Sequence, residues 1–332
     1  MDELLAGLKA VAETTRLRLL FVLSHGEFNV SELTQILGQS QPRISRHLKL
    51  MGEAGLLSRN KEGSWVLFRL REHGMGGALA RAIVDLLPGA DELLARDLGR
   101  LEAVRTQRAE AAAGYFESNA VNWDKLRSLH VSEEAVEAAM LEIAGKRMVD
   151  THVDLGTGTG RILQLFAPHA RQAIGIDSSR EMLALARVRL DDAGLRHAQV
   201  RQADIYALPF QNAFAERVTL HQVLHYLDEP GRALVEIARI LKPDGTAIIA
   251  DFAPHELEML RDQHAHRRLG ISAEQMSGWV KKAGLQILAH DILPPPWRDG
   301  RTGLTVSIWQ LAPLGATAAA DKHQIETIRA DG

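Results

Sequence analysis

The sequence predicts an α/β protein of two domains, a small helical N-terminal domain with a β-hairpin and a larger C-terminal domain built on seven strands. Two observations carry this prediction. Short amphipathic segments and one hairpin pattern fill the first 75 residues, and from about residue 148 strand-like runs alternate with helical ones. The length of 332 residues is enough for two domains that each bury a core.

Residues 1–75 contain the start and stop signals of consecutive short helices. Asn29, with Glu32 three residues later, forms a capping-box pattern at the start of SELTQIL, and Gly38 ends that segment. Ser40 can cap the next helix, which has apolar residues on one face and basic residues on another. The segment LLSRNKEGSWVLFRL then has two apolar-rich runs around a polar turn, which predicts a β-hairpin.

Residues 76–147 are expected to form a helical linker that also dimerises the chain and covers a pocket. The stretch from Asp91 to Glu117 is rich in Ala, Leu, Arg and Glu and has no proline, which predicts one long helix or two joined helices. A leucine stripe in this stretch is more typical of a core or a dimer seam than of a ligand site. At the other end of the chain, residues 314–332 are expected to form a flexible tail.

Residues 148–313 change to the hydrophobic period of strands. The seven strand-like runs are MVDTHVDLG, QAIGID, AQVRQAD, ERVTLHQ, GTAIIADF, LQILAHDIL and TVSIWQLAP. Because helical segments separate most of these runs, they predict a Rossmann-like α/β domain with a mostly parallel sheet.

Charge and composition limit the function classes. The net charge of −3 argues against a nucleic-acid partner, but residues 41–71 hold seven Lys/Arg against two acids. That leaves 32 of the 39 basic and 40 of the 42 acidic residues elsewhere, so the N-terminal domain has a local basic footprint typical of a DNA-binding module.

The absence of cysteine excludes disulfides, thiolate metal sites and cysteine nucleophiles. No run of about 18 apolar residues occurs and the N-terminus is acidic, so we expect a cytoplasmic protein without membrane contact.

A glycine-rich loop, GTGTG, follows the first strand of the C-terminal domain and opens a helix. Gly156, Gly158 and Gly160 allow the backbone to turn tightly and to approach a ligand closely. Nicotinamide dinucleotide enzymes also have such a loop, so the loop alone does not identify the ligand.

Three carboxylates near successive strand ends narrow the choice of ligand. Asp154 lies two residues before the first glycine, where it could face an ammonium group and would repel a pyrophosphate. Asp177 can accept hydrogen bonds from both hydroxyls of a ribose, each contributing about 1.5–3 kcal/mol. Asp204 is placed to accept from the exocyclic amine of adenine. An ammonium, a ribose diol and an adenine amine together describe S-adenosylmethionine (AdoMet).

Residues from about 115 to 313 resemble class I AdoMet-dependent methyltransferases, because DLGTGTG, GID, AD…LPF, VTLHQVLHYL and LKPDG stand in the order and spacing of that family. The resemblance implies a seven-stranded sheet with AdoMet across the carboxyl ends of its first strands. The segment AAGYFESNAVNWDKLRSLHV is similar to one that often covers the pocket, so Tyr115, Phe116 and Trp123 either line the pocket or belong to the core. The expected cofactor-binding residues are Asp154, Gly156, Gly158, Gly160, Asp177, Ser178, Asp204, Ile205, His221, Tyr115 and Trp123.

Methyl transfer from a sulfonium mainly requires an acceptor held in line in a pocket that excludes water. His221, near the place of the transferring methyl in the family, is the candidate catalytic residue, as a base or as pocket wall; a packed or merely polar histidine is the alternative. His221 and His225 lack an intervening Glu and a nearby third ligand, so no metal is expected. The segment 255–268, rich in His and Arg, could line an acceptor pocket or form a solvated helix face. No motif identifies the acceptor.

Residues 1 to about 75 resemble the ArsR family of winged-helix repressors in LKAVAETTRLRLLFVL, SQPRISRHLKLMGEAGLL and NKEGSWVLFRL. The resemblance implies a winged helix-turn-helix domain in a homodimer that binds an inverted repeat in double-stranded DNA. A helix after Ser40 would enter the major groove, and the wing would reach phosphates. The candidate DNA-binding residues are Gln41, Arg43, Ser45, Arg46, His47, Lys49, Arg59 and Lys61. A winged helix used only for dimerisation or protein contact is the alternative.

Asn29 and Ser31 stand where the metal-binding thiols of that family would be. Residues 75–110 contain no histidine, so metal sensing is not expected and the AdoMet pocket is the remaining ligand site. Three functions stay open: a transcription regulator, in the first place a repressor, that senses AdoMet, S-adenosylhomocysteine (AdoHcy) or a methylated metabolite; a small-molecule methyltransferase whose winged helix serves autoregulation or dimerisation; and a nicotinamide oxidoreductase, which Asp154 and Asp204 disfavour. We expect the regulator, with a domain competent for methyl transfer.

Overall fold

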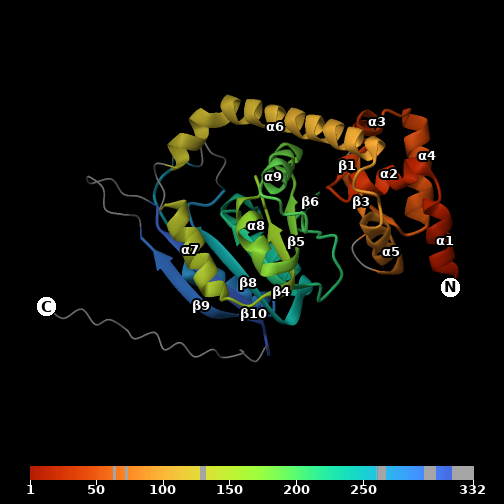
Figure 1. The fold of residues 1–332 in the computed structure, drawn as a ribbon. Helices are drawn as coiled ribbons and strands as arrows, with labels where there is room; N and C mark the ends of the chain where they lie inside the picture. The colour runs from red at the N-terminus through yellow and green to blue at the C-terminus, as the bar shows by residue number, and fades with distance from the viewer. Residues whose placement is uncertain are drawn as a thin grey trace.

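A computed structural model of the chain describes residues 1–62, 65–71, 74–127, 132–258, 260, 267–294 and 304–315. For residues 60–62, 65, 109 and 111–127 only the backbone is described. Two domains are joined by the long helix α6 (Glu92–Arg127), which runs from the N-terminal domain across the C-terminal one (Figure 1). The predicted fold class is confirmed, and the helix expected from Asp91 to Glu117 is a single helix that extends further.

The N-terminal domain is a small helical unit with a three-stranded antiparallel sheet in the order β1-β3-β2. Its helices are α1 (Asp2–Val11), α2 (Thr14–Leu23), α3 (Val30–Leu37), α4 (Gln41–Glu53) and α5 (Gly74–Asp85). Its strands are β1 (Phe28–Asn29), β2 (Leu57–Glu62) and β3 (Trp65–Leu70). Strands β2 and β3 pair as the predicted hairpin.

The ends of α3 confirm the predicted signals. The Oδ1 atom of Asn29 accepts from the backbone N–H of Glu32 at 3.0 Å, and the Glu32 carboxylate accepts from the Asn29 N–H at 2.8 Å. Gly38 ends the helix with a left-handed φ of 64°. Ser40 is the residue that precedes α4, but its side chain makes no capping hydrogen bond. Pro42 in the first turn of α4 lacks one of the N–H groups that such a cap would bind.

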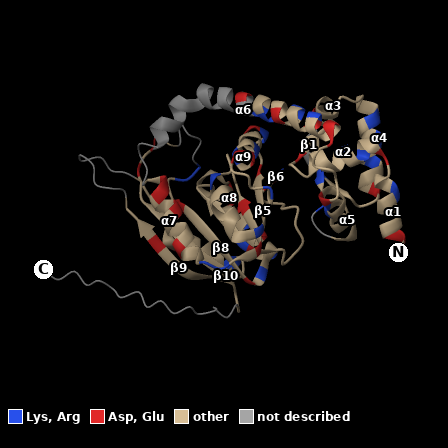
Figure 2. Cartoon of the chain, in the orientation of Figure 1, with Lys and Arg blue, Asp and Glu red and all other residues tan. Residues whose placement is uncertain are grey.

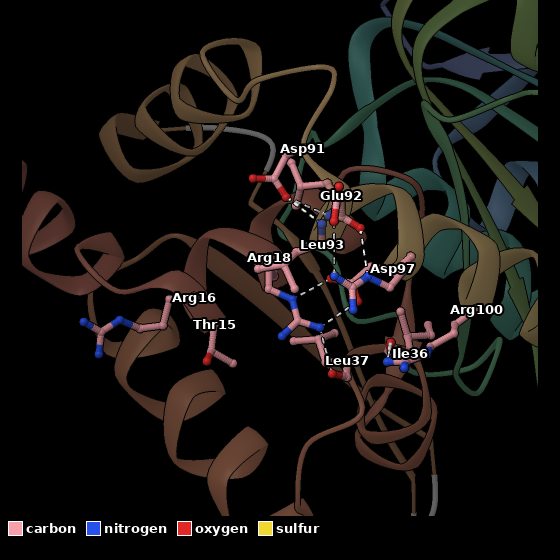
Figure 3. A network of polar contacts seen from close by, with 12 residues as sticks. Thr15, Arg16, Arg18, Ile36, Leu37, Asp91, Glu92, Leu93, Asp97 and Arg100 are labelled. Atoms are coloured by element: carbon pink, nitrogen blue, oxygen red, sulfur yellow. Dashed lines mark hydrogen bonds and ion pairs between the residues drawn. The ribbon is translucent and has the colours of Figure 1, made fainter.

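A buried ion pair fastens α6 to the N-terminal domain (Figure 3). Arg18 of α2 donates from Nε and Nη2 to the two carboxylate oxygens of Asp97 at 2.6 and 2.7 Å. The same Nη2 also donates to the carbonyl oxygen of Leu37 at 2.7 Å. Because Asp97 is fully buried, this paired geometry ties α2, the end of α3 and the start of α6 together.

The C-terminal domain is a seven-stranded sheet in the order β6-β5-β4-β7-β8-β10-β9 with helices on its faces (Figure 1). The strands are β4 (Val149–Leu155), β5 (Ala170–Asp177), β6 (Ala198–Gln202), β7 (Ala215–His221), β8 (Leu241–Phe252), β9 (Leu285–Leu293) and β10 (Val306–Pro313). The helices are α7 (Glu133–Ala144), α8 (Arg161–Phe166), α9 (Arg180–Asp192), α10 (Pro230–Ile240) and α12 (Ala273–Lys282), with short 3₁₀ turns η1 (Ala167–His169) and η2 (Leu224–Tyr226). Strands β6, β5, β4, β7 and β8 are parallel, whereas β10 is antiparallel to both neighbours. The prediction of a mostly parallel sheet is therefore confirmed.

The middle strands are buried on both faces because helices cover the sheet on each side. Strands β4, β5 and β7 each contain four consecutive buried residues, which is typical of parallel strands in α/β proteins. Among the described helices, none has the length and apolar character needed to cross a membrane.

Helix α9 joins the two domains through ion pairs at its C-terminal half. The Nε atom of Arg187 donates to the carboxylate of Glu27 at 2.6 Å, and both side chains are nearly buried. Asp191 lies 3.8 Å from Nε of Arg105 on α6. The end of α9 is therefore held against the start of the β1–α3 segment of the N-terminal domain.

Candidate ligand and nucleic-acid sites

The glycine-rich loop lies at the carboxyl edge of the sheet, between β4 and α8. Gly156, Gly158 and Gly160 have positive φ angles of 65°, 52° and 79°, which favour glycine. A Cβ atom on Gly156 would lie 2.3 Å from Cγ2 of Val223, and one on Gly160 would lie 3.0 Å from Cβ of Ala186. A Cβ atom on Gly158 would meet only the Gly156 carbonyl oxygen, at 4.0 Å. The first and third glycines thus permit close packing, whereas the second borders open space.

Asp154 is a buried carboxyl at the end of β4. Its Oδ1 atom accepts from the Thr219 hydroxyl at 2.6 Å, and its Oδ2 atom has no hydrogen-bond partner among the described residues. The Thr157 hydroxyl lies nearby without reaching hydrogen-bond geometry. Burial raises the pKa of Asp154 to about 6, against the opposing effect of these two hydroxyls. A cationic group beside Oδ2 would favour the ionised form.

Asp177, at the end of β5, connects the glycine-rich loop to the start of α9. Its Oδ2 atom accepts from the Gly158 N–H and its Oδ1 atom from the Ser179 N–H, each at 2.8 Å. Ser179 in turn caps α9 by accepting from the Met182 N–H. Each carboxylate oxygen keeps a further lone pair that can accept from a ligand hydroxyl. Ser178, next in the chain, is exposed at the same edge.

Asp204 lies in the turn after β6, because that strand ends at Gln202 rather than at the predicted position. Its exposed carboxylate accepts from the Tyr206 N–H at 2.9 Å. Ile205 is partly buried against the apolar core of the sheet. Because β6, β5 and β4 are adjacent and parallel, the three predicted aspartates follow neighbouring strands at one edge.

Two histidines and a buried aspartate lie beside this edge. His221 ends β7, and burial lowers its pKa to about 4, so its imidazole is neutral at pH 7. His225 is buried in η2, where its Nδ1 atom is 2.7 Å from Oδ1 of Asp251. His221 lies at the end of a strand and His225 in a 3₁₀ turn, so the two side chains do not lie on one face of a helix. Asp251 and Thr219 could not be identified from the sequence. Asp251 contacts His225 in the turn η2, and Thr219 contacts Asp154 on the neighbouring strand β4, and the order of the chain reveals neither contact.

Several predicted pocket residues lie outside the described side chains. Tyr115, Phe116 and Trp123 lie within α6, where the structure describes only their backbone. In the His- and Arg-rich segment, residues 259 and 261–266 lie outside the described residues. The backbone N–H groups of Arg267 and Arg268 both donate to the carbonyl oxygen of His225, so the end of that segment lies against η2.

Helix α4 presents a basic face on the outer side of the N-terminal domain (Figure 2). Its apolar face of Ile44, Leu48 and Met51 is buried. The exposed candidates are Gln41, Arg43, Ser45, Arg46 and Lys49 on α4, and Arg59 on β2. The His47 side chain instead is mostly buried and lies 4.0 Å from Glu13, so it points into the domain rather than outward. The Lys61 side chain is not described.

The segment around Asn29 and Ser31 forms part of the domain junction. Asn29 is occupied by the capping box, and Ser31 is exposed on α3. Arg108 of α6 donates to both carboxylate oxygens of Glu32 at 2.8 Å. Side chains of α6 and α9 therefore contact the segment in which the ArsR resemblance would place metal-binding thiols.

Two family models match the chain. Residues 13–59 match the bacterial regulatory protein, arsR family, and residues 153–249 match the methyltransferase domain. The arsenical resistance operon repressor of Escherichia coli is 50% identical over 66 residues, which cover 20% of this chain and 56% of that protein.

Two further relatives cover other parts of the chain. An uncharacterized 37.1 kDa protein in transposon TN4556 of Streptomyces fradiae is 30% identical over 236 residues, 65% of each chain. The uncharacterized methyltransferase YcgJ of Bacillus subtilis is 27% identical over 146 residues, 41% of this chain and 58% of that protein. Its crystal structure aligns with a TM-score of 0.47 and 18% identity, covering 55% of this chain and 100% of that chain.

The matched regions span between 56% and 65% of the length of these curated relatives. The arsR match begins just before α2 and ends within β2, so α1 and α5 lie outside it, and the methyltransferase match runs from β4 into β8. In one chain, a region that matches the arsR family of regulators is therefore followed by a region that matches a methyltransferase domain and lies on the seven-stranded sheet described above.

Proposed function

We propose that the protein is a DNA-binding transcription regulator, acting as a repressor, whose DNA affinity depends on AdoMet or AdoHcy bound in its methyltransferase domain. In this assignment residues 1–75 bind DNA, residues 76–147 link and dimerise the chain, residues 148–313 bind the nucleoside ligand, and residues 314–332 form a tail. The coupling requires that the ligand binds the DNA-competent and DNA-incompetent states with different affinities.

The carboxyl edge of the sheet suits AdoMet in its charges and hydrogen-bond acceptors. The unsatisfied Oδ2 atom of buried Asp154 would accept from the ligand's ammonium group. Asp177, fixed by two backbone N–H groups, would accept from the ribose hydroxyls, and exposed Asp204 from the adenine amine. Gly158 leaves room for the ligand above the loop. When bound, AdoMet would supply an electrophilic methyl group.

One observation carries the regulatory part of the proposal: a single helix touches both the ligand site and the DNA-binding domain. Ser179, the cap of α9, donates its N–H to Asp177, the proposed ribose acceptor. Near the other end of the same helix, Arg187 pairs with Glu27 just before α3. Because α9 is a rigid element of 13 residues, a displacement of its first turn by a ligand would reach the N-terminal domain.

The N-terminal domain supports DNA binding as a dimer. Exposed Arg43, Arg46 and Lys49 on α4 can enter a major groove and contact base edges and phosphates. Large apolar side chains are exposed on α1, on α5 and just after α5, and these two helices pack against each other. They are Leu5, Leu8, Met75 and Leu86, between 43% and 83% exposed. We assign these side chains, together with residues 76–147, to the homodimer interface, so α1 and the start of α5 also take part in dimerisation.

A small-molecule methyltransferase remains the second candidate because of the buried His225–Asp251 pair. Asp251 accepts from the His225 backbone N–H and lies 2.7 Å from its Nδ1 atom, which fixes the orientation of the His225 ring. A histidine oriented by a carboxylate is suited to receive the proton that an acceptor loses during methyl transfer. In this candidate His225 is the oriented proton acceptor, and His221 is a weaker base or a wall of the pocket.

The test is fluorescence anisotropy on labelled duplex DNA from upstream of the protein's own gene, with AdoMet, AdoHcy or neither. We expect AdoHcy or AdoMet to change the Kd for DNA by about fivefold or more, within the usual range of allosteric coupling. Asp177→Ala should weaken ligand binding by about tenfold or more and remove this ligand effect, because it removes the ribose acceptor. Arg43→Ala with Arg46→Ala should abolish specific DNA binding while leaving ligand binding unchanged.

The outcomes separate the candidates. Specific DNA binding that neither ligand changes would favour an enzyme that carries its own repressor. Unchanged ligand affinity in Asp177→Ala would contradict the ribose assignment, and specific DNA retention after the double arginine change would contradict the role of α4.

A further inference from the structure

A cavity of about 650 Å³ lies at the domain junction, on the amino edge of the sheet. Its walls come from both domains: the segment from Leu23 to Glu27 and the end of β3 on one side, and the first residues of β4, β5 and β6 with the end of α9 on the other. The amino edge is opposite to the glycine-rich loop, because β4, β5 and β6 run parallel from this cavity toward Asp154 and Asp177. The cavity is therefore separate from the proposed AdoMet site.

The lining of this cavity is strongly cationic. Seven arginines line it: Arg69, Arg71, Arg81, Arg108, Arg171, Arg187 and Arg196. The carboxylates in the same lining are Glu27, Asp150 and Asp191, so the formal excess is four positive charges. If Arg108 is assigned to its partner Glu32, which does not line the cavity, three positive charges still remain in excess.

The ion pairs within the lining leave a cationic group on each wall. Glu27 holds Arg187 at 2.6 Å, and Asp150 lies 3.4 Å from Arg171. Arg71, just after β3, and Arg196, in the loop before β6, are both exposed. Neither forms an ion pair with a residue in the described part of the chain. One of the two belongs to the DNA-binding domain and the other to the methyltransferase domain.

The shape and chemistry of the cavity indicate the class of ligand. Guanidinium groups present planar sets of N–H donors that match phosphate oxygens. Part of the wall is apolar, from Leu23, Leu190, Leu195 and Val200. The volume falls in the range of small-molecule sites and is far too small for a DNA duplex.

We propose that this junction cavity binds a small phosphate-bearing metabolite, which bridges Arg71 of the DNA-binding domain and Arg196 of the methyltransferase domain. Binding requires the two walls to face each other as they do here, so the ligand stabilises this arrangement of the domains. The protein thus has a second effector site, spatially separate from the proposed AdoMet site.

The experiment is isothermal titration calorimetry of inorganic pyrophosphate into the full-length chain, with and without saturating AdoHcy. Arg71→Ala and Arg196→Ala are each expected to raise the Kd for pyrophosphate at least fivefold, and the double variant more. The matched control is Arg96→Ala with Arg147→Ala, which removes two exposed arginines outside the cavity and should change the Kd less than twofold. Circular dichroism and AdoHcy affinity should be the same in all variants, which shows that each is folded.

Three results would overturn the proposal: no binding of pyrophosphate by the wild-type chain, equal weakening in the cavity and control variants, or an effect of only one of the two cavity arginines. Displacement of pyrophosphate by a short DNA duplex would also overturn it, since the cationic wall would then belong to a DNA surface. Because the titration is also run without AdoHcy, loss of AdoHcy binding would contradict the proposed function alone.

Discussion

The two edges of the seven-stranded sheet carry opposite charges. At the carboxyl edge, Asp154 and Asp177 lie at the ends of β4 and β5, and Asp204 follows β6. At the amino edge, Arg171 near the start of β5 and Arg196 just before β6 line the cavity at the domain junction. Helix α9 spans the distance between them, with its first turn bonded to Asp177 and its last turns at the arginine-lined cavity. The proposed site for a ligand with a cationic group and the proposed anion site therefore lie on one sheet and are joined by one helix.

The edges also differ in how their charges are held. Asp154 is 1% exposed and has an oxygen without a partner in the described structure, so one well-placed cation has a large effect there. Arg71 and Arg196, which form no ion pair within the described residues, are exposed to solvent, so each contributes less than Asp154 and the proposed anion site depends on both acting together. The difference predicts large single-residue effects at the carboxyl edge and graded effects at the amino edge.

The largest expected effect comes from Asp97→Ala, which should disrupt the cavity at the amino edge and spare the site at the carboxyl edge. Asp97→Ala leaves Arg18 buried without its carboxylate, which should reduce the free energy of unfolding of the N-terminal domain by about 3–5 kcal/mol. Because this pair fastens α6 to the N-terminal domain, the wall that holds Arg71 should be displaced and pyrophosphate binding lost. AdoHcy binding at the opposite edge should change less than about twofold. Urea unfolding and calorimetry measure these quantities.

The control for this change is Glu92→Ala, on the same helix but with a side chain that is 92% exposed. It should leave unfolding within about 0.5 kcal/mol of the wild type. An Asp97→Ala chain as stable as this control would contradict the anchoring role of the buried pair.

The second effect concerns Asp154, and two opposite changes are expected from one substitution. Asp154→Asn removes the charge that would bind the ligand's ammonium, so AdoMet affinity at pH 7 should fall about tenfold or more. The same change should stabilise the ligand-free protein at pH 7 by on the order of 1–3 kcal/mol, because ionising a buried carboxyl whose pKa is raised to about 6 opposes folding.

The pH dependence of the stability gain has a definite sign. The raised pKa means that the protonated carboxyl favours the folded state, and this contribution is lost as the pH rises from about 4 through 6. The stability advantage of Asp154→Asn should therefore disappear near pH 4, measured by thermal unfolding from pH 4 to 8. The AdoMet affinity of the wild type should weaken below pH 6, whereas that of the variant should not. A constant stability difference across this range would contradict the assignment.

These contrasts show which features local sequence could predict. The capping box at Asn29, the hairpin and all seven strands were predictable because their signals are periodic or lie within a few residues. The three aspartates were placed at one edge because parallel strands bring their carboxyl ends together. Partners from distant parts of the chain were not predictable: Arg18 with Asp97, Glu27 with Arg187, and Asp154 with Thr219.

His47 and the junction cavity illustrate the same limit. By helical spacing, His47 belongs with the basic residues of α4, but contact with Glu13 turns it inward. The arginines of the cavity come from positions between Arg69 and Arg196, and the packing of the two domains through α6 and α9 brings those of the two walls together. The count of charged residues showed that residues 41–71 are basic. It could not show that some of these residues lie on α4 whereas Arg69 and Arg71 line the cavity.

The smallest expected effect tests whether carboxylates limit the anion site. Glu27 accepts from Nε of Arg187 at 2.6 Å inside the cavity lining, where it competes with any phosphate for that guanidinium. Glu27→Gln should therefore tighten pyrophosphate binding by about three- to tenfold, or roughly 0.7–1.4 kcal/mol. Glu102→Gln, which neutralises an exposed carboxylate outside the lining, should change the Kd less than twofold. A gain in the Glu27 variant alone would mean that a ligand at the amino edge competes directly with the ion pair that joins α9 to the DNA-binding domain. An equal gain in both would reduce the amino edge to a general field of positive charge, and only the carboxyl edge would then be a defined site.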